Sequence, residues 1–259
     1  MHLAAESHVD NSIDHPDIFI ETNLKGTFTL IDVAYRYWMN APFKFKKGYD
    51  ESMFLHVSTD EVYGSLGKTG LFTETSPYAP NSPYSASKAG SDFIVRSYRH
   101  TYGMRTVITN CSNNYGPKQH DEKLIPTVIR KALAGEPIPI YGDGSNVRDW
   151  LYVMDHCKGL DLAFHKKNNA ELYNIGGRNE WSNLNIATRI CELLDDFNPL
   201  NKGSYKNQIR FVKDRAGHDF RYAIDASKIE NELGWKADET FETGIVKTVE
   251  WYLKKYNGK

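Results

Sequence analysis

Residues 53–61 read MFLHVSTDE, a short apolar run that ends in a group of polar side chains. A run of this length suits a buried strand, and α/β folds place their active sites at the carboxyl ends of such strands. Asp60 and Glu61 stand at that end, although charge near a core costs free energy unless it is used or paired. The two carboxylates therefore indicate either an active site or the N-terminus of a helix, where acidic side chains suit the dipole.

The next strong signal is a predicted helix at Pro83–Tyr102, with Ser82 as its N-cap and Pro83 as its first residue. Tyr84 and Lys88 are four residues apart, so their side chains share one face of this helix. An ammonium group beside a phenol favours the phenolate and lowers the pKa of the tyrosine, which yields a usable base near neutral pH. Taken alone, the pair fits an exposed helix surface better, and its place after the strand end is what favours an active site.

Helical and strand-like segments alternate along the chain, which is typical of an α/β fold with a largely parallel sheet. We expect a helix at residues 16–38, with one face made by Phe19, Asn23, Gly26, Thr27 and Leu30. Other expected elements are a loop at 64–83, a strand at 106–110, a turn at 113–117, helices at 123–134, 184–194 and Phe241–Tyr256, and strands near Ile138, Leu172 and Ile209. This order predicts a Rossmann-like, doubly wound parallel sheet in residues 1–115 and a smaller α/β substrate domain in residues 116–259, with some later segments returning to the first domain.

The composition is that of an ordinary soluble globular protein: 40% of the 259 residues are hydrophobic, 25% are charged and the net charge is −1. This balance argues against a nucleic-acid or membrane-surface binder, so an anionic ligand would need a few placed cations. Cys111, Cys157 and Cys191 lack metal-ligand spacing and are expected to be free thiols, with no metal bound. No signal peptide is visible and no stretch approaches the ~18 apolar residues that span a bilayer, which predicts a cytoplasmic protein.

Six spaced motifs strengthen this interpretation. They are HVSTDEVYG (56–64), PYSASKA (83–89), NCSNNYGP (110–117), RDWLYV (148–153), YNIGG (173–177) and DRAGHDFRYAID (214–225). Together with the opening HLAAESHVD (2–10), they resemble the successive motifs of the dTDP-glucose 4,6-dehydratases, a family of the extended short-chain dehydrogenase/reductase superfamily. The resemblance covers essentially the whole chain and implies an NAD-dependent lyase that acts on a nucleotide sugar.

The resemblance assigns the family's chemistry to residues of this chain by motif position. Tyr84, helped by Lys88, would take the proton of the sugar's 4-hydroxyl while hydride leaves C4 for NAD. Glu61 would then remove the C5 proton and Asp60 would protonate the departing 6-hydroxyl, after which hydride returns to C6 and gives the 4-keto-6-deoxy sugar. Thr59 would hydrogen-bond the 4-oxygen. A 4-epimerase needs no acid and base at C5 and C6, so Asp60 and Glu61 favour dehydration.

The same resemblance implies two sets of ligand-binding residues. Those expected to line the nicotinamide half of NAD are Leu3, Ala4, Ala5, Glu6, Ser7, Thr22, Tyr84, Lys88 and Asn114. Those expected to hold dTDP-glucose are Ser7, Thr59, Asn113, Lys123, Leu124, Pro139, Ile140, Tyr141, Arg148, Asn183, Arg215 and His218. Arginine offers a planar fork for phosphate oxygens, and an aromatic face stacks on a nucleobase. Ordinary surface cations, a tyrosine at the core edge and a structural loop histidine are the alternative interpretations.

A dinucleotide-binding fold normally opens with a strand, a glycine-rich turn and a helix whose N-terminus holds the pyrophosphate. A single methionine precedes the HLAAESHVD motif, so we expect about 80 residues to be missing upstream, at ~30 for each βαβ unit. The expected origin is an incomplete form of a real dehydratase. The alternatives are another nucleotide-sugar dehydratase, a 4-epimerase, or a catalytically dead fragment that binds sugar nucleotides. The resemblance also implies a homodimer paired through residues 16–38 and 82–102, in a pathway to rhamnose or another surface polysaccharide.

Overall fold

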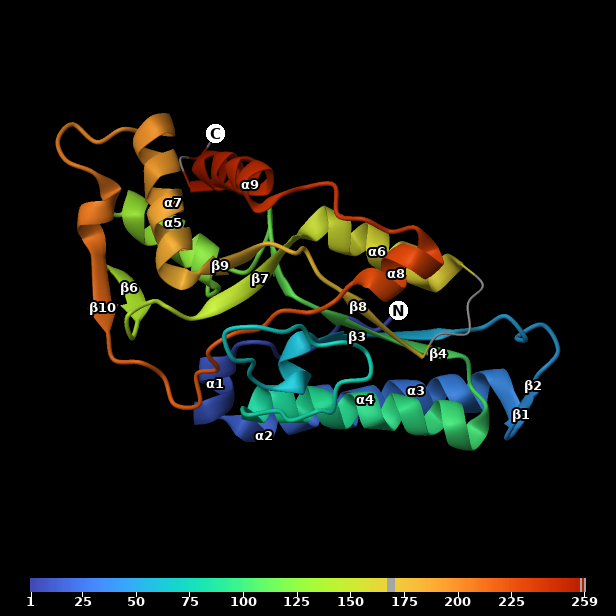
Figure 1. Cartoon of the computed structure of the whole chain (residues 1–259). Coiled ribbons are helices and arrows are strands. Elements are labelled where there is room, and N and C mark those ends of the chain that lie inside the picture. The colour runs from blue at the N-terminus through green and yellow to red at the C-terminus, as the bar shows by residue number, and fades with distance from the viewer. Residues whose placement is uncertain (167–170, 257, 259) are drawn as a thin grey trace.

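The computed structural model describes residues 1–166, 171–256 and 258. Its fold is centred on a parallel sheet that lies between two layers of helices (Figure 1). The strands β3 (Phe54–Thr59), β4 (Thr106–Cys111) and β8 (Leu172–Ile175) are hydrogen-bonded in that order, all parallel. His2 pairs with His56 in the same direction along the other edge of β3. The strands are nearly continuous buried runs because helices cover both faces of the sheet.

Helices on both faces confirm the expected doubly wound α/β class (Figure 1). One face packs on α4 and, beyond it, α3, with Ile31, Val95 and Ile108 in the core between them. The opposite face packs on α6 and α8 and buries Val107 and Trp235. The helices in chain order are α1 (Val9–Asp14), α2 (Pro16–Phe19), α3 (Gly26–Trp38), α4 (Pro83–Tyr102), α5 (Leu124–Leu133), α6 (Val153–His165), α7 (Asn183–Phe197), α8 (Ser227–Leu233) and α9 (Phe241–Tyr256).

Helix α4 begins and ends where its sequence predicts. The backbone N–H of Ser85 donates to the Ser82 hydroxyl oxygen at 3.0 Å, and the Ser82 N–H donates to the Ser85 hydroxyl oxygen at 3.0 Å, which is a reciprocal capping box. Gly103 ends the helix in the left-handed conformation, with φ at 72°. The capping box at Ser82 fixes the first turns of α4, and Tyr84 and Lys88 belong to those turns.

The predicted helix at residues 16–38 is continuous but irregular, since the π-helical turn η1 (Ile20–Lys25) separates α2 from α3. A π turn is wider than an α turn. Residues spaced four apart therefore stay on one face here, whereas in an α-helix the spacing along one face alternates between three and four residues. Leu30 was expected on that face and is instead 48% exposed. The buried face is formed by Phe19, Asn23, Thr27 and Ile31.

A second group of strands follows the main sheet. β7 (Val147–Tyr152) pairs parallel with β5 (Asn113–Tyr115) and antiparallel with β9 (Glu180–Ser182), while β6 (Ile138–Tyr141) pairs parallel with β10 (Ile209–Val212). The turn expected at 113–117 is therefore wrong for its first three residues, because they find a partner in β7. The strand β7 and the helix α6 that follows it were not predicted. The expected strands near Ile138, Leu172 and Ile209 and the three later helices are confirmed.

The apolar interior of this second group lies between α5, α7 and α9 and includes Tyr115, Trp150 and Phe241. Smaller elements complete the fold: the hairpin β1 (Met39–Ala41) and β2 (Lys44–Phe45), and the 3-10 turns η2 (Asp60–Tyr63) and η3 (Tyr205–Gln208). Three elements that follow residue 116 pack in the layers of the main sheet, namely β8, α6 and α8. The domain boundary at 115/116 stays a prediction. In the ranges that the structure describes, no helix is long and apolar enough to cross a membrane.

Candidate active site

The carboxyl ends of β3 and β4 meet the first turns of α4, and polar residues of these elements gather there. Thr59 ends β3, and Asp60 and Glu61 begin the 3-10 turn η2. The Glu61 N–H donates to the Thr59 hydroxyl oxygen at 3.3 Å, and that hydroxyl lies 3.4 Å from Asp60 Oδ1. The carboxylates thus occupy a helical first turn, as one interpretation predicted. The burial of Asp60 shows that this turn is not simply a solvated surface.

The two carboxyls have different electrostatic surroundings. Asp60 is 1% exposed, and its Oδ2 has no hydrogen-bond partner among the described residues. Burial, together with the Glu61 and Asp149 carboxylates, raises the pKa of Asp60 well above its usual range. Burial also raises the pKa of Glu61, but the positive charges of Arg148 and Arg215 act against that rise. Asp60 therefore suits a proton donor and Glu61 an ionised base.

Tyr84 and Lys88 are both buried at the start of α4. The Lys88 ammonium donates to the carbonyl oxygen of Val57 at 2.8 Å. Burial raises the pKa of Tyr84 well above its usual range, and the Glu61 charge adds to that effect. The expected lowering of the tyrosine pKa is therefore wrong for the chain alone, because removing a phenolate from water is costly and the Glu61 and Asp60 carboxyls add to that cost.

Asn23, which the sequence analysis placed on a helix face but not in the site, holds the segment after His2 against α4. The Glu6 N–H donates to Asn23 Oδ1 at 2.9 Å, and Asn23 Nδ2 donates to the Glu6 carbonyl oxygen at 3.0 Å and to Ser87 Oγ at 2.9 Å. These bonds join residues expected to line the cofactor to the turn between Tyr84 and Lys88. The sequence signal that could have identified Asn23 is an amide side chain on the buried face of a predicted helix, where it needs hydrogen-bond partners.

A cavity of about 350 Å³ opens beside Glu61. It brings together every residue expected to hold the substrate except Thr59, which ends β3. These residues are Ser7, Asn113, Lys123, Leu124, Pro139, Ile140, Tyr141, Arg148, Asn183, Arg215 and His218. Asp10, Glu122 and Trp150 also line the cavity and were not predicted. Its volume suits a small organic ligand.

The lining of this cavity includes two anchored cations. Arg148 is buried, donates to the Asp219 carbonyl oxygen at 3.0 Å and lies 4.3 Å from the centre of the Tyr222 ring. Lys123 is the N-cap of α5 and donates to the Ser7 carbonyl oxygen at 2.5 Å. A helix N-terminus that lines a cavity together with cations is a suitable place for phosphate oxygens.

One end of the cavity is built around Asp10 of α1. Tyr141 donates to Asp10 Oδ2 at 2.9 Å, and Arg215 Nη1 lies 3.3 Å from Asp10 Oδ1. His218 meets the Tyr141 ring edge-on, with centres 6.3 Å apart, and its Nδ1 lies 2.7 Å from the Asp214 carboxylate. Asp10 thereby joins α1 to β6 through Tyr141 and to the segment after β10 through Arg215.

Comparisons with known proteins agree with this geometry. The profile of the GDP-mannose 4,6 dehydratase family matches residues 1–248. A dTDP-glucose 4,6-dehydratase of Xanthomonas campestris pv. campestris is 56% identical over 254 residues, which cover 98% of this chain and 72% of that protein. The chain belongs to the nucleotide-sugar 4,6-dehydratase family. The family expected from the motifs is confirmed.

Two further dehydratases extend this result. The dTDP-glucose 4,6-dehydratase 1 of Escherichia coli K12 is 55% identical over 262 residues, covering 98% of this chain and 72% of that protein. The crystal structure of the dTDP-glucose 4,6-dehydratase of Streptomyces venezuelae, with NAD and a second ligand bound, aligns with a TM-score of 0.87. It is 44% identical, and the alignment covers 99% of this chain and 73% of that one.

The dehydratase residues expected to line the nicotinamide half of NAD fit such a ligand. Leu3, Ala4 and Ala5 are exposed along the edge beside β3, so a flat ring can approach their backbone. Asn114 on β5 donates to Cys111 Sγ at 3.2 Å, while its buried Oδ1 has no partner in the described part of the chain. Thr22 lies in η1, one residue before Asn23.

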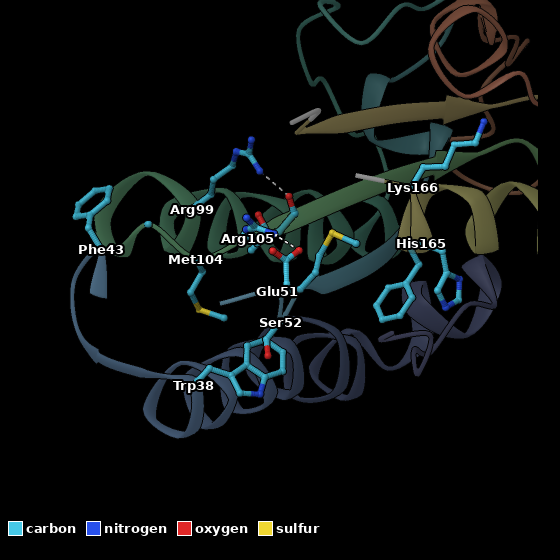
Figure 2. Close-up of a pocket in the computed structure, with 13 residues that line it drawn as sticks. Trp38, Phe43, Glu51, Ser52, Arg99, Met104, Arg105, His165 and Lys166 are labelled. Carbon is cyan, nitrogen blue, oxygen red and sulfur yellow. Dashed lines mark hydrogen bonds and ion pairs between the residues drawn. The ribbon is translucent and has the colours of Figure 1, made fainter. Parts of the chain in front are cut away.

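Two other places offer weaker sites for a cofactor or ligand. GSLGKTG (64–70) has the glycine spacing of a dinucleotide-binding turn, but it follows η2 and lies in the loop before α4 rather than between a strand and a helix. The cavity in Figure 2 is larger, about 1020 Å³, and contains none of the predicted dehydratase residues. The described residues include no cluster of His, Cys, Asp or Glu that could hold a metal ion.

Proposed function

We propose that the chain dehydrates dTDP-glucose to dTDP-4-keto-6-deoxyglucose, with NAD as a cofactor that is regenerated in each turnover. The observation that carries this proposal is the pair Asp60 and Glu61: two carboxyls with unlike surroundings, one of them lining the substrate cavity, next to Tyr84. A reaction that removes a proton at C5 and a hydroxyl at C6 needs such an acid and base. Reversible oxidation at C4 alone, as in a 4-epimerase, does not.

The residues divide the reaction among themselves. Bound NAD supplies the hydride acceptor for C4, the hydride donor for C6 and a positive charge near Tyr84. Tyr84 takes the proton of the 4-hydroxyl, and Thr59 holds the 4-oxygen in place. Glu61 accepts the C5 proton, which the new 4-ketone has made acidic, and Asp60 gives its proton to the 6-hydroxyl, which departs as water. Glu61 finally returns its proton to C5.

The substrate cavity supplies orientation. Lys123, Arg148 and Arg215 carry the positive charge that a nucleoside diphosphate requires, and Tyr141 at the Asp10 end offers a face for the base. The sugar then lies toward Glu61, which lines the same cavity. This direction fits the carboxyl-end rule for parallel sheets.

Incubation of the purified chain with NAD and dTDP-glucose tests the proposal. We expect a product lighter by one water, with a 4-ketone that is detected by its absorbance in alkali. A product of unchanged mass with inverted C4 would contradict dehydration, and turnover of another nucleotide sugar in preference to dTDP-glucose would contradict the substrate. If the chain is silent, the same assay is repeated after fusion to an upstream glycine-rich half from a relative. Silence of that fusion rejects the assignment.

We also propose that two copies pair through α3. Leu30, Val33 and Tyr37 follow helical spacing and are 48%, 59% and 61% exposed. A charged substitution, Val33→Glu, should convert a dimer into a monomer in light scattering, while Lys25→Glu at the N-cap before the same helix should not. A wild-type monomer would reject the dimer.

The surroundings of the protein follow from the same reaction. Its three cysteines are free, which suits the reducing cytoplasm that we propose for it. The 4-keto-6-deoxy product suits a pathway that epimerises and reduces the sugar toward rhamnose or another surface polysaccharide.

A further inference from the structure

A buried charged cluster lies behind Lys88, on the side away from the substrate cavity. Asp92 follows Lys88 by four residues on α4, is 2% exposed and lies with Oδ1 3.3 Å from Nε2 of His56 on β3. His56 is fully buried, and burial together with the Lys88 charge lowers its pKa. The imidazole is therefore neutral near physiological pH and does not balance the Asp92 charge.

The two oxygens of Asp92 have unequal partners. Oδ2 accepts from the Ser58 hydroxyl at 2.8 Å and from the Tyr78 hydroxyl at 3.0 Å, and the Tyr78 oxygen accepts in turn from Asn110 Nδ2 at 3.1 Å. Oδ1 accepts no hydrogen bond from the part of the chain that the structure describes. Neutral donors thus satisfy one oxygen, and the charge of the carboxylate calls for a cation.

Lys88, one turn before Asp92 on α4, is the cation that we assign to it, and it acts across a gap because the two side chains form no direct ion pair. It is 3% exposed, and the Val57 carbonyl takes one of its three donor positions. Burial lowers the pKa of Lys88, and the Asp92 carboxylate is the first influence acting in the opposite direction. The ionisable groups that face this pair are His2 before β3, His56 on β3, Cys111 on β4, and Tyr78, Glu74, Arg96, Glu171 and Lys228 around the adjoining cavity of about 450 Å³.

We propose that Asp92 is a positioning residue for the dehydratase reaction: its carboxylate is the counter-charge that keeps the buried Lys88 protonated next to Tyr84. The proposal rests on the proposed function for the role of Lys88, but the charge pair itself can be tested without turnover. A purely structural Asp92 would only accept hydrogen bonds from Ser58 and Tyr78, and an asparagine oxygen would serve equally well there. The two roles therefore differ in what Asp92→Asn changes.

The first test measures stability in a double-mutant cycle of Asp92→Asn and Lys88→Met. Removing one partner of a buried pair leaves the other charge uncompensated, so we expect each single variant to lower the midpoint of thermal unfolding. The midpoint of the double variant should fall by clearly less than the sum of the two single falls, since the double variant leaves no lone charge. Additive losses overturn the proposal. The control is Asp32→Asn, whose carboxylate bonds to Arg36 and Tyr98 on the same side of the sheet and should be additive with Lys88→Met.

The second test isolates C4 oxidation. In a dTDP-pentose that lacks C6 the reaction stops after this step, so the absorbance of reduced nicotinamide reports Tyr84 and Lys88 without Asp60 and Glu61. Loss of a nearby negative charge lowers the pKa of its neighbours, so the pH profile of Asp92→Asn should move to lower pH by about one unit. Asp92→Glu keeps the negative charge, so its profile should return most of the way to that of the wild type, and the profile of Asp32→Asn should match the wild type.

An Asp92→Asn profile that overlays the wild type overturns the proposal, whatever its height, because a structural role changes rate without moving the profile. If the wild type oxidises no substrate even after fusion to an upstream glycine-rich half, the proposed function fails. The stability cycle still decides whether Asp92 and Lys88 form a charge pair.

Discussion

The two ends of the β3–β4–β8 sheet carry similar residue types in opposite environments. At the carboxyl end, Asp60, Lys88 and Arg148 are almost fully buried. At the amino end, the cavity of Figure 2 is lined by charges such as Arg105 and Glu51, which pair at 3.0 Å with side chains 50% and 64% exposed. Water screens the second group and not the first.

This contrast leads us to choose between the two cavities by the burial of the charges near them rather than by their size. The amino-end cavity is about 1020 Å³ and the substrate cavity about 350 Å³. Exposed ion pairs contribute little to stability and require no special role. Buried charges lower the stability of the fold, so their presence indicates another use. We therefore place function where the charges are buried, and the predictions below test that choice.

The largest effect should come from Tyr84→Phe at the carboxyl end. Without its hydroxyl, no group takes the proton from the 4-hydroxyl, so kcat should fall by about 10²–10⁴-fold. Product formation from dTDP-glucose measures this change. Tyr98→Phe is the matched control, because Tyr98 is also buried on α4 but bonds to Asp32, away from the site. Equal losses in the two variants would show that the effect is structural.

Asp60→Asn should reduce dehydration by about 10²–10³-fold while C4 oxidation continues, because only the proton donor to the 6-hydroxyl is lost. Its raised pKa keeps Asp60 protonated over a wider range, so the wild-type rate of elimination should fall as pH rises through that pKa. The rate should also fall as pH drops through the pKa of Glu61, which acts ionised. Asp161→Asn, at an exposed position of α6, should leave both limbs of the pH profile in place. A profile of Asp60→Asn with its alkaline limb unchanged would contradict the assignment.

Arg215→Gln should weaken binding of dTDP by about tenfold or somewhat more, since it removes one charge-assisted contact and leaves the other cations in place. Calorimetry with dTDP alone measures this without turnover. Arg210→Gln on β10 is the control, because Arg210 is exposed and donates to backbone carbonyls of its own segment. Similar affinities for both variants would remove Arg215 from the site.

The smallest effect should come from Glu51→Gln at the amino end. An exposed pair contributes about 0–1 kcal/mol, so the midpoint of unfolding should barely change and kcat should stay the same. Lys25→Gln, which loses another exposed pair with Glu21, should behave alike. A marked loss of activity in Glu51→Gln would reverse the comparison and make the larger cavity functional.

Local chemistry explains which elements were predictable. The capping box and left-handed Gly103 of α4 are short-range features, and the apolar run of β3 is buried whatever it packs against. The π turn at η1 and the strand β5 were missed, because each depends on a partner distant in sequence. Because the π turn was missed, the prediction for Leu30 was wrong. A regular helix would bury this side chain, and the wider turn exposes it.

The candidate site divides in the same way. The motifs named the residues of the substrate cavity, and the structure brings all but Thr59 to its walls. They did not single out Asn23, Asp10 or Asp92, whose importance lies in contacts with residues far along the chain. The motifs also gave the wrong direction for the pKa of Tyr84. The spacing along the helix reveals that an ammonium is nearby, but it does not reveal how deeply the tyrosine is buried.

The sequence by itself determined the α/β class, the ends of α4, the family and the chemical types of the site, since these depend on local caps, periodicity and motif identity. The tertiary structure alone decided how far each charge is removed from water, which carboxyl stays protonated more readily and which anion stands behind Lys88. Desolvation and Coulomb interactions are set by distance and burial in space, and neither quantity is a property of neighbouring residues along the chain.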